Sequence, residues 1–451
     1  MASAKRTSLM HRVWRWHFFA GLAVVPFVLI LSVTGAIYLF KPQYDAAIEQ
    51  RVNGALPANG SLEAEIVLEQ ALSYHPGSRL VRMILPTSPD DRTMEAEVIG
   101  GDGTAYTLWL DKTSGDVLHE AETNNRFMNF VKRIHSSLLG GDLASLLVEL
   151  MACWALILVV TGLFLWWPRN RPWWRVLVPD FSSGSGTRSL LMQLHGAVGA
   201  WVSVLAIIML LSGLPWTQVW GDGFTRAKAM AGLHSPGQVW FVTLQSSDPH
   251  AMHDMGGTLW ETENRAAEDQ SSVHADMIMD EPLSIDQIAD QAMNEGLAAP
   301  VWLQPPRGEN GVWTVRGMNA NRLKQETVHY DRWTGEEVLR IRFDDHNVVD
   351  KTMALGVSFH EGALFGWTNQ LLGLLAATGV VTLSVTGAWM WWARRPKGRM
   401  GVPPMPSDKG IVFGVAVLII ILGVFLPLAG LTLVICLILD WVWSRFVSVR
   451  A

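Results

Sequence analysis

Apolar residues are gathered along this chain in blocks of roughly twenty, and long polar stretches separate the blocks. A block of that length is enough for one helix to cross the hydrocarbon core of a bilayer. The last two blocks are short and meet around Pro427, so we expect them to form a tight hairpin. The pattern predicts an α-helical membrane protein with about six spans, at residues 18–40, 145–167, 191–215, 368–392, 410–427 and 428–446.

Two long polar stretches, 41–144 and 216–367, predict domains outside the membrane. Each contains a helix-like stretch, Leu62–Ser73 in the first and Ser284–Glu295 in the second, followed by alternating strand-like runs. A helix with a small antiparallel sheet, an α+β domain, is the simplest interpretation of each. The piece 221–283 has no counterpart in the first domain, and we expect it to be a loop-rich insertion.

Short polar segments inside the strand-like runs predict hairpin turns. Asp111–Gly115 and Asp331–Gly335 have Asp and Gly at matching places, and these residues adopt turn conformations that others avoid. We divide the chain into the N-terminus and first span (1–40), the first external domain with an interfacial helix (41–144), two spans and their loop (145–215), the second external domain (216–367), a fourth span (368–392), and a loop with the C-terminal hairpin (393–451).

The chain is internally duplicated. Three pairs of similar strings occur in the same order in both halves: WHFFAGL at 16–22 with LHGAVGA at 194–200, IHSSLLGG at 134–141 with FHEGALFG at 359–366, and TGLFLWWPR at 161–169 with TGAWMWWAR at 386–394. Fixed-order self-similarity of this kind indicates a repeated structural unit. We interpret the molecule as span, external domain, span, twice over, followed by the hairpin.

Composition and charge agree with this picture. Apolar residues make up 49% of the chain and charged residues only 17%, whereas a soluble domain has about a quarter charged. Lys and Arg cluster before the first span, at 169–188, at 394–409 and at the C-terminus. The positive-inside bias then predicts cytoplasmic termini and periplasmic external domains. The first apolar run is too long for a cleaved signal and is followed by Lys41-Pro42, so we expect it to remain as an anchor.

Four of the thirteen histidines occupy equivalent places in the repeat. His17 and His195 lie just inside the cytoplasmic end of outward-going spans, and His135 and His360 lie just before inward-going spans. Ionisable residues in spans are costly and indicate function, and neutral imidazole is a common axial ligand of haem iron. Two pairs at two depths therefore predict bis-His coordination of two b-type haems, His17 with His195 and His135 with His360.

The spacing of the second pair limits where these histidines lie. His135 and His360 each precede a Trp pair by 32 residues, which in an unbroken helix is about 48 Å, against a hydrocarbon core of about 30 Å. We expect a bend near Gly140-Gly141 or Gly362–Gly366, or a place at the external interface. The Trp pairs end matching spans, where indole rings anchor helices.

Alternatives remain for several residues. The four histidines could be interfacial residues that duplication copied, and His11 could replace His17. His250 and His253 suit a transition metal, although an exposed polar loop is the plainer interpretation. Three cations before the second span could attract an anionic chelate or simply line an interfacial helix: Arg126, Lys132 and Arg133. The two Cys lie in apolar runs and indicate no disulfide framework.

The ordered set of strings resembles the PepSY-associated transmembrane helix proteins of bacterial inner membranes, over roughly residues 10–400. The resemblance implies two periplasmic PepSY-like domains and a role in iron uptake as a di-haem ferric-siderophore reductase, with His17, His195, His135 and His360 as haem ligands. Some relatives carry a fused flavin reductase module, whereas no phosphate-binding Gly-rich loop follows a strand here. The electron donor is then a quinol or a separate reductase.

We therefore expect an inner-membrane oxidoreductase that passes electrons through two haems to a periplasmic ferric siderophore or other ferric chelate, with membrane lipid but no nucleic acid among its partners. The first alternative is a non-redox receptor or regulator whose external domains bind a peptide or protein. A metal permease is a second alternative, but we expect no buried Asp or Glu within a span, as a cation path would need.

Overall fold

The computed structural model describes residues 2–54, 60–88, 90–168, 172–180, 186–233, 283–307, 311–395 and 421–448. These residues form two compact units. The first, which we call the bundle, comprises residues 1–39, 131–224 and 365–451, and the second, the sheet unit, comprises 40–130 and 225–364. Each unit is therefore assembled from segments of both halves of the duplicated chain.

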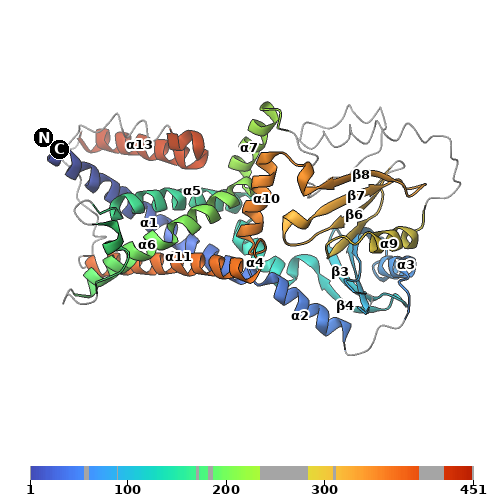
Figure 1. Ribbon diagram of the computed structural model, residues 1–451. Coiled ribbons are helices and arrows are strands. Elements are labelled where there is room, and N and C mark those ends of the chain that lie inside the picture. The colour runs from blue at the N-terminus through green and yellow to red at the C-terminus, as the bar shows by residue number, and fades with distance from the viewer. Residues whose placement is uncertain are drawn as a thin grey trace. The chain divides into compact units, whose positions relative to one another are not determined.

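Four long apolar helices make up the bundle: α1 (Ala2–Tyr38), α5 (Gly141–Trp166), α6 (Thr187–Gly213) and α11 (Trp367–Arg394). Both α1 and α6 pack against α5 and against α11, which closes the ring of four (Figure 1). Each helix includes a stretch long and apolar enough to cross a membrane. Four of the predicted spans are confirmed in this way, and the helix of the first extends well before residue 18.

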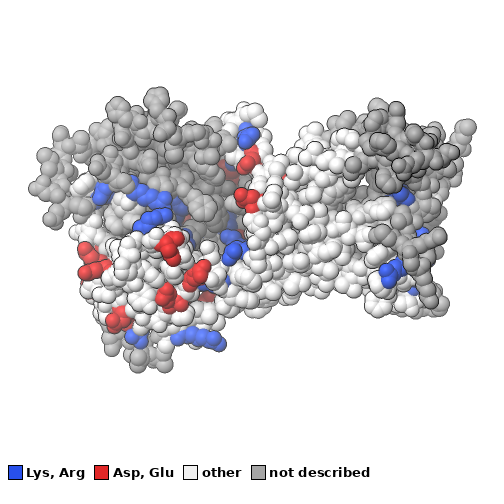
Figure 2. Space-filling view, turned by 180° about the vertical axis from the view of Figure 1, so that it is seen from behind, with Lys and Arg blue, Asp and Glu red and all other residues white. Residues whose placement is uncertain are grey.

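The surface of the bundle is that of a membrane protein. Large apolar side chains are exposed along it, among them Val160, Trp201 and Val204. Figure 2 shows the flank of the bundle in white over most of its length, without Lys, Arg, Asp or Glu. The basic residues of the four long helices belong to one end, where α1 and α6 begin and α11 finishes. A lipid-facing surface has this distribution of charge.

The C-terminal part contains the helix α13 (Pro427–Ser448), which follows a short helical segment at 421–425. Leu426 and Ala429 are buried where the two meet, in a core cluster with Cys153 of α5. The helix is interrupted at Leu426, and Gly423 and Gly430 approach so closely that a Cβ on Gly430 would collide with Gly423. The predicted hairpin of two spans stays a prediction. Residues 410–420 of the predicted fifth span lie outside the described residues.

The expected bends before the inward-going spans are confirmed. The helix that carries His135, α4 (Phe127–Ser137), ends before α5 begins, and Leu138 and Leu139 between them have positive φ angles of 46° and 61°. The helix that carries His360, α10 (Val348–His360), ends at that histidine, six residues before α11. Both histidines thus lie at helix ends rather than inside a span.

One expectation about the insertion is wrong. Helix α7 (Gln218–Met230) occupies residues 221–230, and it follows α6 as the equally long α2 (Lys41–Asn53) follows α1. The first ten residues of the expected insertion therefore have a counterpart in the first half, which the dissimilar sequences concealed. Residues 234–282 lie outside the described residues. Short 3-10 helices occur at Thr123–Asn125, Trp173–Val176, Leu214–Trp216, Arg322–Lys324 and Phe343–Asp345.

The sheet unit contains one antiparallel sheet of eight strands in the order β4-β3-β2-β1-β5-β6-β7-β8. The strands of the first half are β1 (Arg79–Ile84), β2 (Thr93–Ile99), β3 (Ala105–Asp111) and β4 (Val117–Glu122). Those of the second are β5 (Val301–Gln304), β6 (Trp313–Gly317), β7 (Glu326–Tyr330) and β8 (Glu337–Arg342). The two predicted α+β domains are therefore halves of a single sheet.

The junction of the halves is the pairing of β1 with β5, where Met83 lies opposite Leu303. Helices α3 (Ala64–Tyr74) and α9 (Ile285–Asn294) lie side by side on one face of the sheet (Figure 1). Met83, Leu303 and the apolar faces of both helices share one continuous hydrophobic core. Asp286 of α9 accepts a hydrogen bond from the backbone N–H of Glu65 of α3, at 3.0 Å. Neither half has a core of its own.

The two predicted hairpin turns are confirmed and have the same structure. Asp111 accepts hydrogen bonds from the backbone N–H groups two and three residues later, and Asp331 does the same. Gly115 and Gly335 close these turns at φ angles of 74° and 71°, a region that favours glycine.

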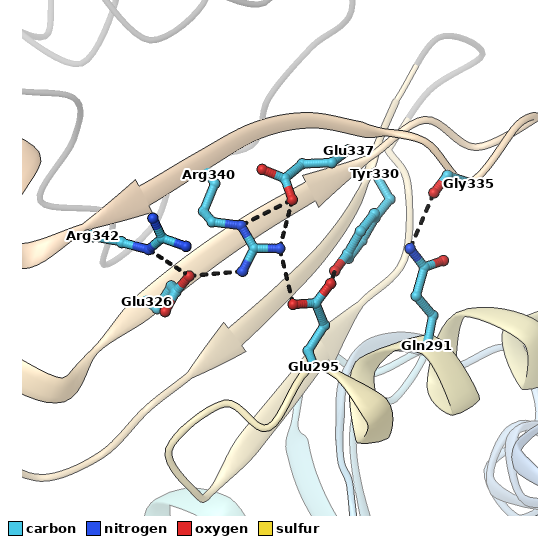
Figure 3. Close-up of polar contacts among 8 residues, drawn as sticks. All are labelled: Gln291, Glu295, Glu326, Tyr330, Gly335, Glu337, Arg340 and Arg342. Carbon is cyan, nitrogen blue, oxygen red and sulfur yellow. Dashed lines mark hydrogen bonds and ion pairs between the residues drawn. The ribbon is translucent and has the colours of Figure 1, made fainter.

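Each half also ties the end of its helix to its last strand through side chains. In the first half His75, which follows α3, lies 3.0 Å from Glu120 of β4. In the second half Glu295, which follows α9, lies 2.9 Å from Arg340 of β8 (Figure 3). Arg340 also pairs with the carboxylates of strands β7 and β8, and Tyr330 donates a hydrogen bond to Glu295 at 2.7 Å.

Candidate cofactor site

His17 is held by a threonine of a neighbouring helix. Its Nδ1 lies 2.9 Å from Oγ1 of Thr161, so α1 and α5 are joined by a side-chain hydrogen bond within the apolar bundle. Thr161 begins the string TGLFLWWPR, which recurs in the second half with Thr386 as its first residue. The corresponding contact in the second half would therefore involve Thr386.

The second and third cases have the same geometry. Nδ1 of His195 in α6 lies 2.9 Å from Oγ1 of Thr386 in α11. Nδ1 of His135, at the end of α4, lies 3.1 Å from Oγ1 of Thr34 in α1. Three of the four histidines singled out from the sequence thus have one ring nitrogen on a threonine hydroxyl of another helix.

The hydroxyl protons settle the direction of these three hydrogen bonds. Each of the three threonines donates its proton to the backbone carbonyl four residues earlier in its own helix, at 2.7 Å in all three cases. The hydroxyl oxygen is then an acceptor toward the ring, so Nδ1 carries the ring proton. Nε2 consequently keeps its lone pair, which is the arrangement that metal-ligating histidines show.

A glycine follows each of the three threonines and gives the ring its space. A Cβ added to Gly162 would lie 3.2 Å from Cε1 of His17, and one added to Gly35 would lie 3.2 Å from Cε1 of His135. At Gly387 the corresponding distance to Cε1 of His195 is 3.5 Å. A larger residue would push the imidazole away from its threonine, so the Thr-Gly dipeptide works as one ring-holding unit.

His17 of α1 and His195 of α6 both belong to the bundle, and their pairing as haem ligands stays a prediction. His11 lies six residues before His17 on α1 and is exposed, so Thr161 selects His17 of the two. His135 belongs to the bundle, whereas His360 belongs to the sheet unit, and the pairing of these two stays a prediction.

The histidines are the candidate metal ligands of the bundle. In the described part of the chain no group of three or more His, Cys, Asp or Glu is placed to hold a metal ion. A haem needs only one or two axial ligands from the protein. The residues therefore fit a haem better than a metal ion that protein side chains alone would coordinate.

The expectation that no span holds a buried acid is wrong. Glu149 lies in α5 and is only 1% exposed. Its two carboxylate oxygens accept hydrogen bonds from the backbone N–H groups of Val219 and Trp220, each at 2.9 Å, in the first turn of α7. A carboxylate at a helix N-terminus satisfies free N–H groups and interacts favourably with the helix dipole. Glu149 thus fixes the start of α7 instead of offering a free carboxylate to a cation.

The other candidates from the sequence have different outcomes. Arg126 does not stand free for a chelate, because its guanidinium lies 3.5 Å from Glu95 and over the ring of Trp109. Lys132 and Arg133 are exposed on α4. Cys153 is buried and Cys436 exposed, and neither forms a disulfide. His250 and His253 lie outside the described residues.

The threonines are the site residues that the sequence analysis did not identify. Thr161 and Thr386 opened the quoted repeat strings, and Thr34-Gly35 shows the same dipeptide near the end of α1. The signal was the fixed spacing: His17 precedes Thr34 by 17 residues, as His195 precedes Ser212, and Gly follows in both cases. A hydroxyl-Gly pair therefore occurs near the C-terminal end of each of the four long helices, those of α5 and α11 at the level of His17 and His195 and those of α1 and α6 17 residues further along.

Comparison with known families gives one match. The family model for the PepSY-associated TM region matches residues 14–394, which is most of the chain. No curated protein matches the chain. The chain therefore belongs to the PepSY-associated transmembrane family, as its ordered repeat strings predicted, and it is a membrane protein.

Proposed function

We propose that this member of the PepSY-associated family is an electron-transfer protein of the bacterial inner membrane, which holds two b-type haems and reduces a ferric chelate on the outer side. The donor is a quinol or a separate reductase, since the sequence has no flavin or nucleotide motif of its own. One electron passes to Fe(III) of the chelate, and Fe(II), a weaker partner for hard oxygen ligands, is released.

The observation that carries the proposal is the threefold His-Thr-Gly contact. A single histidine held by a threonine would be an ordinary buried polar pair. Three such pairs, each leaving Nε2 with its lone pair and two of them at repeat-related places, favour a common ligand chemistry. When bound there, haem supplies one-electron transfer at a potential that the surrounding residues tune.

The chain's own residues have defined roles in this proposal. Thr161, Thr386 and Thr34 hold the Nδ1 proton and so fix the ring tautomer. The closed ring of four helices holds His17 and His195 on rigid elements. The basic clusters of the sequence favour a cytoplasmic position for the end with His17 and His195. His135 and His360 would then serve the outer side.

The proposal is tested on the purified full-length protein in detergent. A reduced-minus-oxidised spectrum should show the bands of low-spin b haem, and anaerobic addition of ferric citrate to the reduced protein should reoxidise them. His11→Ala provides the control, since His11 is exposed near the start of α1 and is not one of the proposed ligands, so its loss should leave the spectrum unchanged. A folded but colourless protein would support the rival function, a receptor or regulator that binds a peptide or protein.

A further inference from the structure

The ring of four helices has cations at one end and no acid of its own there to balance them. We call this the basic end, where α1 and α6 begin and α11 finishes. Helices α1, α6 and α11 contain no Asp or Glu. The two acids of α5 fall within residues 141–149, whereas Thr161, near the other end of that helix, is the residue that contacts His17. The four helices therefore supply no counter-charge at their basic end.

Arg12 of α1 differs from two other arginines of this end. The guanidinium of Arg15 lies over the ring of Phe19, 5.1 Å from its centroid, and that of Arg394 lies over the ring of Trp14, at 4.8 Å. Nε of Arg12 is buried and makes no hydrogen bond in the described structure, although the residue as a whole is partly exposed. Buried polar atoms are nearly always paired, so this one calls for an acceptor that the described side chains do not provide.

Arg12 also lies near the proposed haem ligand His17. It precedes His17 by five residues on the same helix, which is about 7.5 Å along the helix axis. The long side chain of arginine can cover such a distance. Because Arg12 lies toward the basic end, its guanidinium is available to a group at the edge of a ring that His17 holds, and not to the iron at the centre of the ring.

The helix faces beside both imidazoles of the proposed pair have room for a flat group. Gly21 lies one turn after His17, on the same face of α1, and a Cβ built on it would meet only Cδ2 of Leu158, at 4.0 Å. Gly199 has the same place relative to His195, and a Cβ there would meet one side chain of a neighbouring helix, at 3.5 Å. These are ordinary contacts, so close helix packing does not require either glycine. A side-chain-free turn beside each imidazole fits a haem ring.

We propose that Arg12 binds a propionate carboxylate of the haem held by His17 and His195. The inference rests on the haem of the proposed function, but not on the reduction of a ferric chelate. A b-type haem has two propionates, and a guanidinium matches a carboxylate with two parallel hydrogen bonds. A propionate gives the buried Nε its acceptor and brings negative charge to the basic end. Arg12 is then a cofactor-binding residue that does not coordinate the iron.

The experiment compares two haems that differ only in these carboxylates. The full-length protein is synthesised in phosphatidylcholine nanodiscs with either haem b or its dimethyl ester, in which both propionates are uncharged. Haem transfer to apomyoglobin measures retention. With haem b, Arg12→Gln should speed the loss of one of the two haems about tenfold, because it removes a charge-assisted hydrogen bond. With the ester, the same exchange should change nothing, because the bond is already absent.

Two further variants complete the comparison. Arg175→Gln is the matched control, since Arg175 carries the same charge but is exposed in the loop between α5 and α6. It should leave the retention of both haems unchanged. Arg12→Lys should hold haem b better than Arg12→Gln and less well than wild type, because lysine keeps the charge and lacks the two-pronged donor. It also serves as the test variant if Arg12→Gln does not fold.

Three results would overturn the proposal. If Arg12 contacts a lipid phosphate instead, its exchange would act equally on the proteins with haem b and with the ester. If a folded, red protein with the Arg12→Gln exchange loses both haems at the wild-type rates, Arg12 is not a haem-binding residue, and the haem function stands. A folded wild-type protein that binds neither haem b nor the ester would refute the haem function and the role of Arg12 together.

Discussion

In the bundle, Thr161 and Thr386 occupy equivalent places of the two halves, and each accepts a hydrogen bond from a histidine at the same distance, 2.9 Å. On the sheet, Glu97 and Arg316 occupy equivalent places and carry opposite charges. Duplication has thus left matching chemistry in one unit and different chemistry in the other. In the function proposed above, the matching contacts hold the two histidines of one haem, one from each half.

The largest effect is expected from removing one histidine of the matched pair. His17→Ala and His195→Ala should each abolish one haem of the two, because a haem held by two axial ligands loses half of its protein coordination. If the bundle is symmetric in function, the two variants should give the same spectrum. Haem content per chain and the reduced spectrum provide the measurement, and unequal losses would show that only one of these residues is a ligand.

A smaller effect is expected from the threonines. Thr386→Val keeps the side-chain shape but removes the acceptor for the Nδ1 proton of His195, which should weaken haem retention by about 10–100-fold. Thr382→Val in the same helix is the matched control, since its hydroxyl bonds to a backbone carbonyl of that helix. Haem transfer to apomyoglobin reports retention, and equal rates for the two variants would refute the role of Thr386.

Different residues fix helix ends in the two halves of the bundle. Glu149 of α5 holds the start of α7, and Gln370 of α11 donates to the carbonyl of Leu39 after α1, at 2.9 Å. Glu149→Gln should cost about 1–3 kcal/mol of stability by leaving N–H groups poorly paired. Thermal unfolding in detergent provides the measurement, with the exposed Asp222→Asn of α7 as control. Equal melting of both variants would mean that Glu149 does not support α7.

The smallest effect is expected at the ion pair between Glu295, which follows α9, and Arg340 of β8. The hydroxyl of Tyr330, and then Arg340, lower the pKa of Glu295 below its ordinary 4.5. A lowered folded pKa means that the carboxylate contributes stability above about pH 4.5 and loses it as the pH falls. Arg340→Met should therefore reduce stability by about 1 kcal/mol or less near neutral pH, with a shallower decline in acid. Melting curves that stay parallel to wild type through the acid range would contradict this.

Much of the bundle could be predicted from the sequence. Four spans followed from uninterrupted apolar runs, and the bends after His135 and at His360 followed from a spacing too long for one membrane crossing. The four histidines could be identified because they recur at matching positions of the two halves, whatever secondary structure the surrounding residues favour. The threonines were not, since Thr-Gly in a membrane helix is as typical of close packing as of a ring-holding contact.

The contacts between distant segments could not be predicted. Nothing in the alternation of β1 and β5 tells which strand edges meet, so the pairing of Met83 with Leu303 and the single sheet were missed. Glu149 was overlooked because its partners, the N–H groups of Val219 and Trp220, are brought to it only by the turn between α6 and α7. The role of Arg126 was left open between a chelate and an interfacial helix, because its partner Glu95 lies on a strand distant in the sequence.

The central claim is that the chain holds two haems, one on His17 with His195 and one on His135 with His360, and the haem content of the purified full-length chain tests it most directly. The pyridine haemochromogen assay, set against protein concentration from amino-acid analysis, gives the number of haems per chain. The account predicts two b-type haems in the wild type and one in His17→Ala. A folded wild-type protein without haem, or a content that the His17→Ala exchange leaves unchanged, would contradict it.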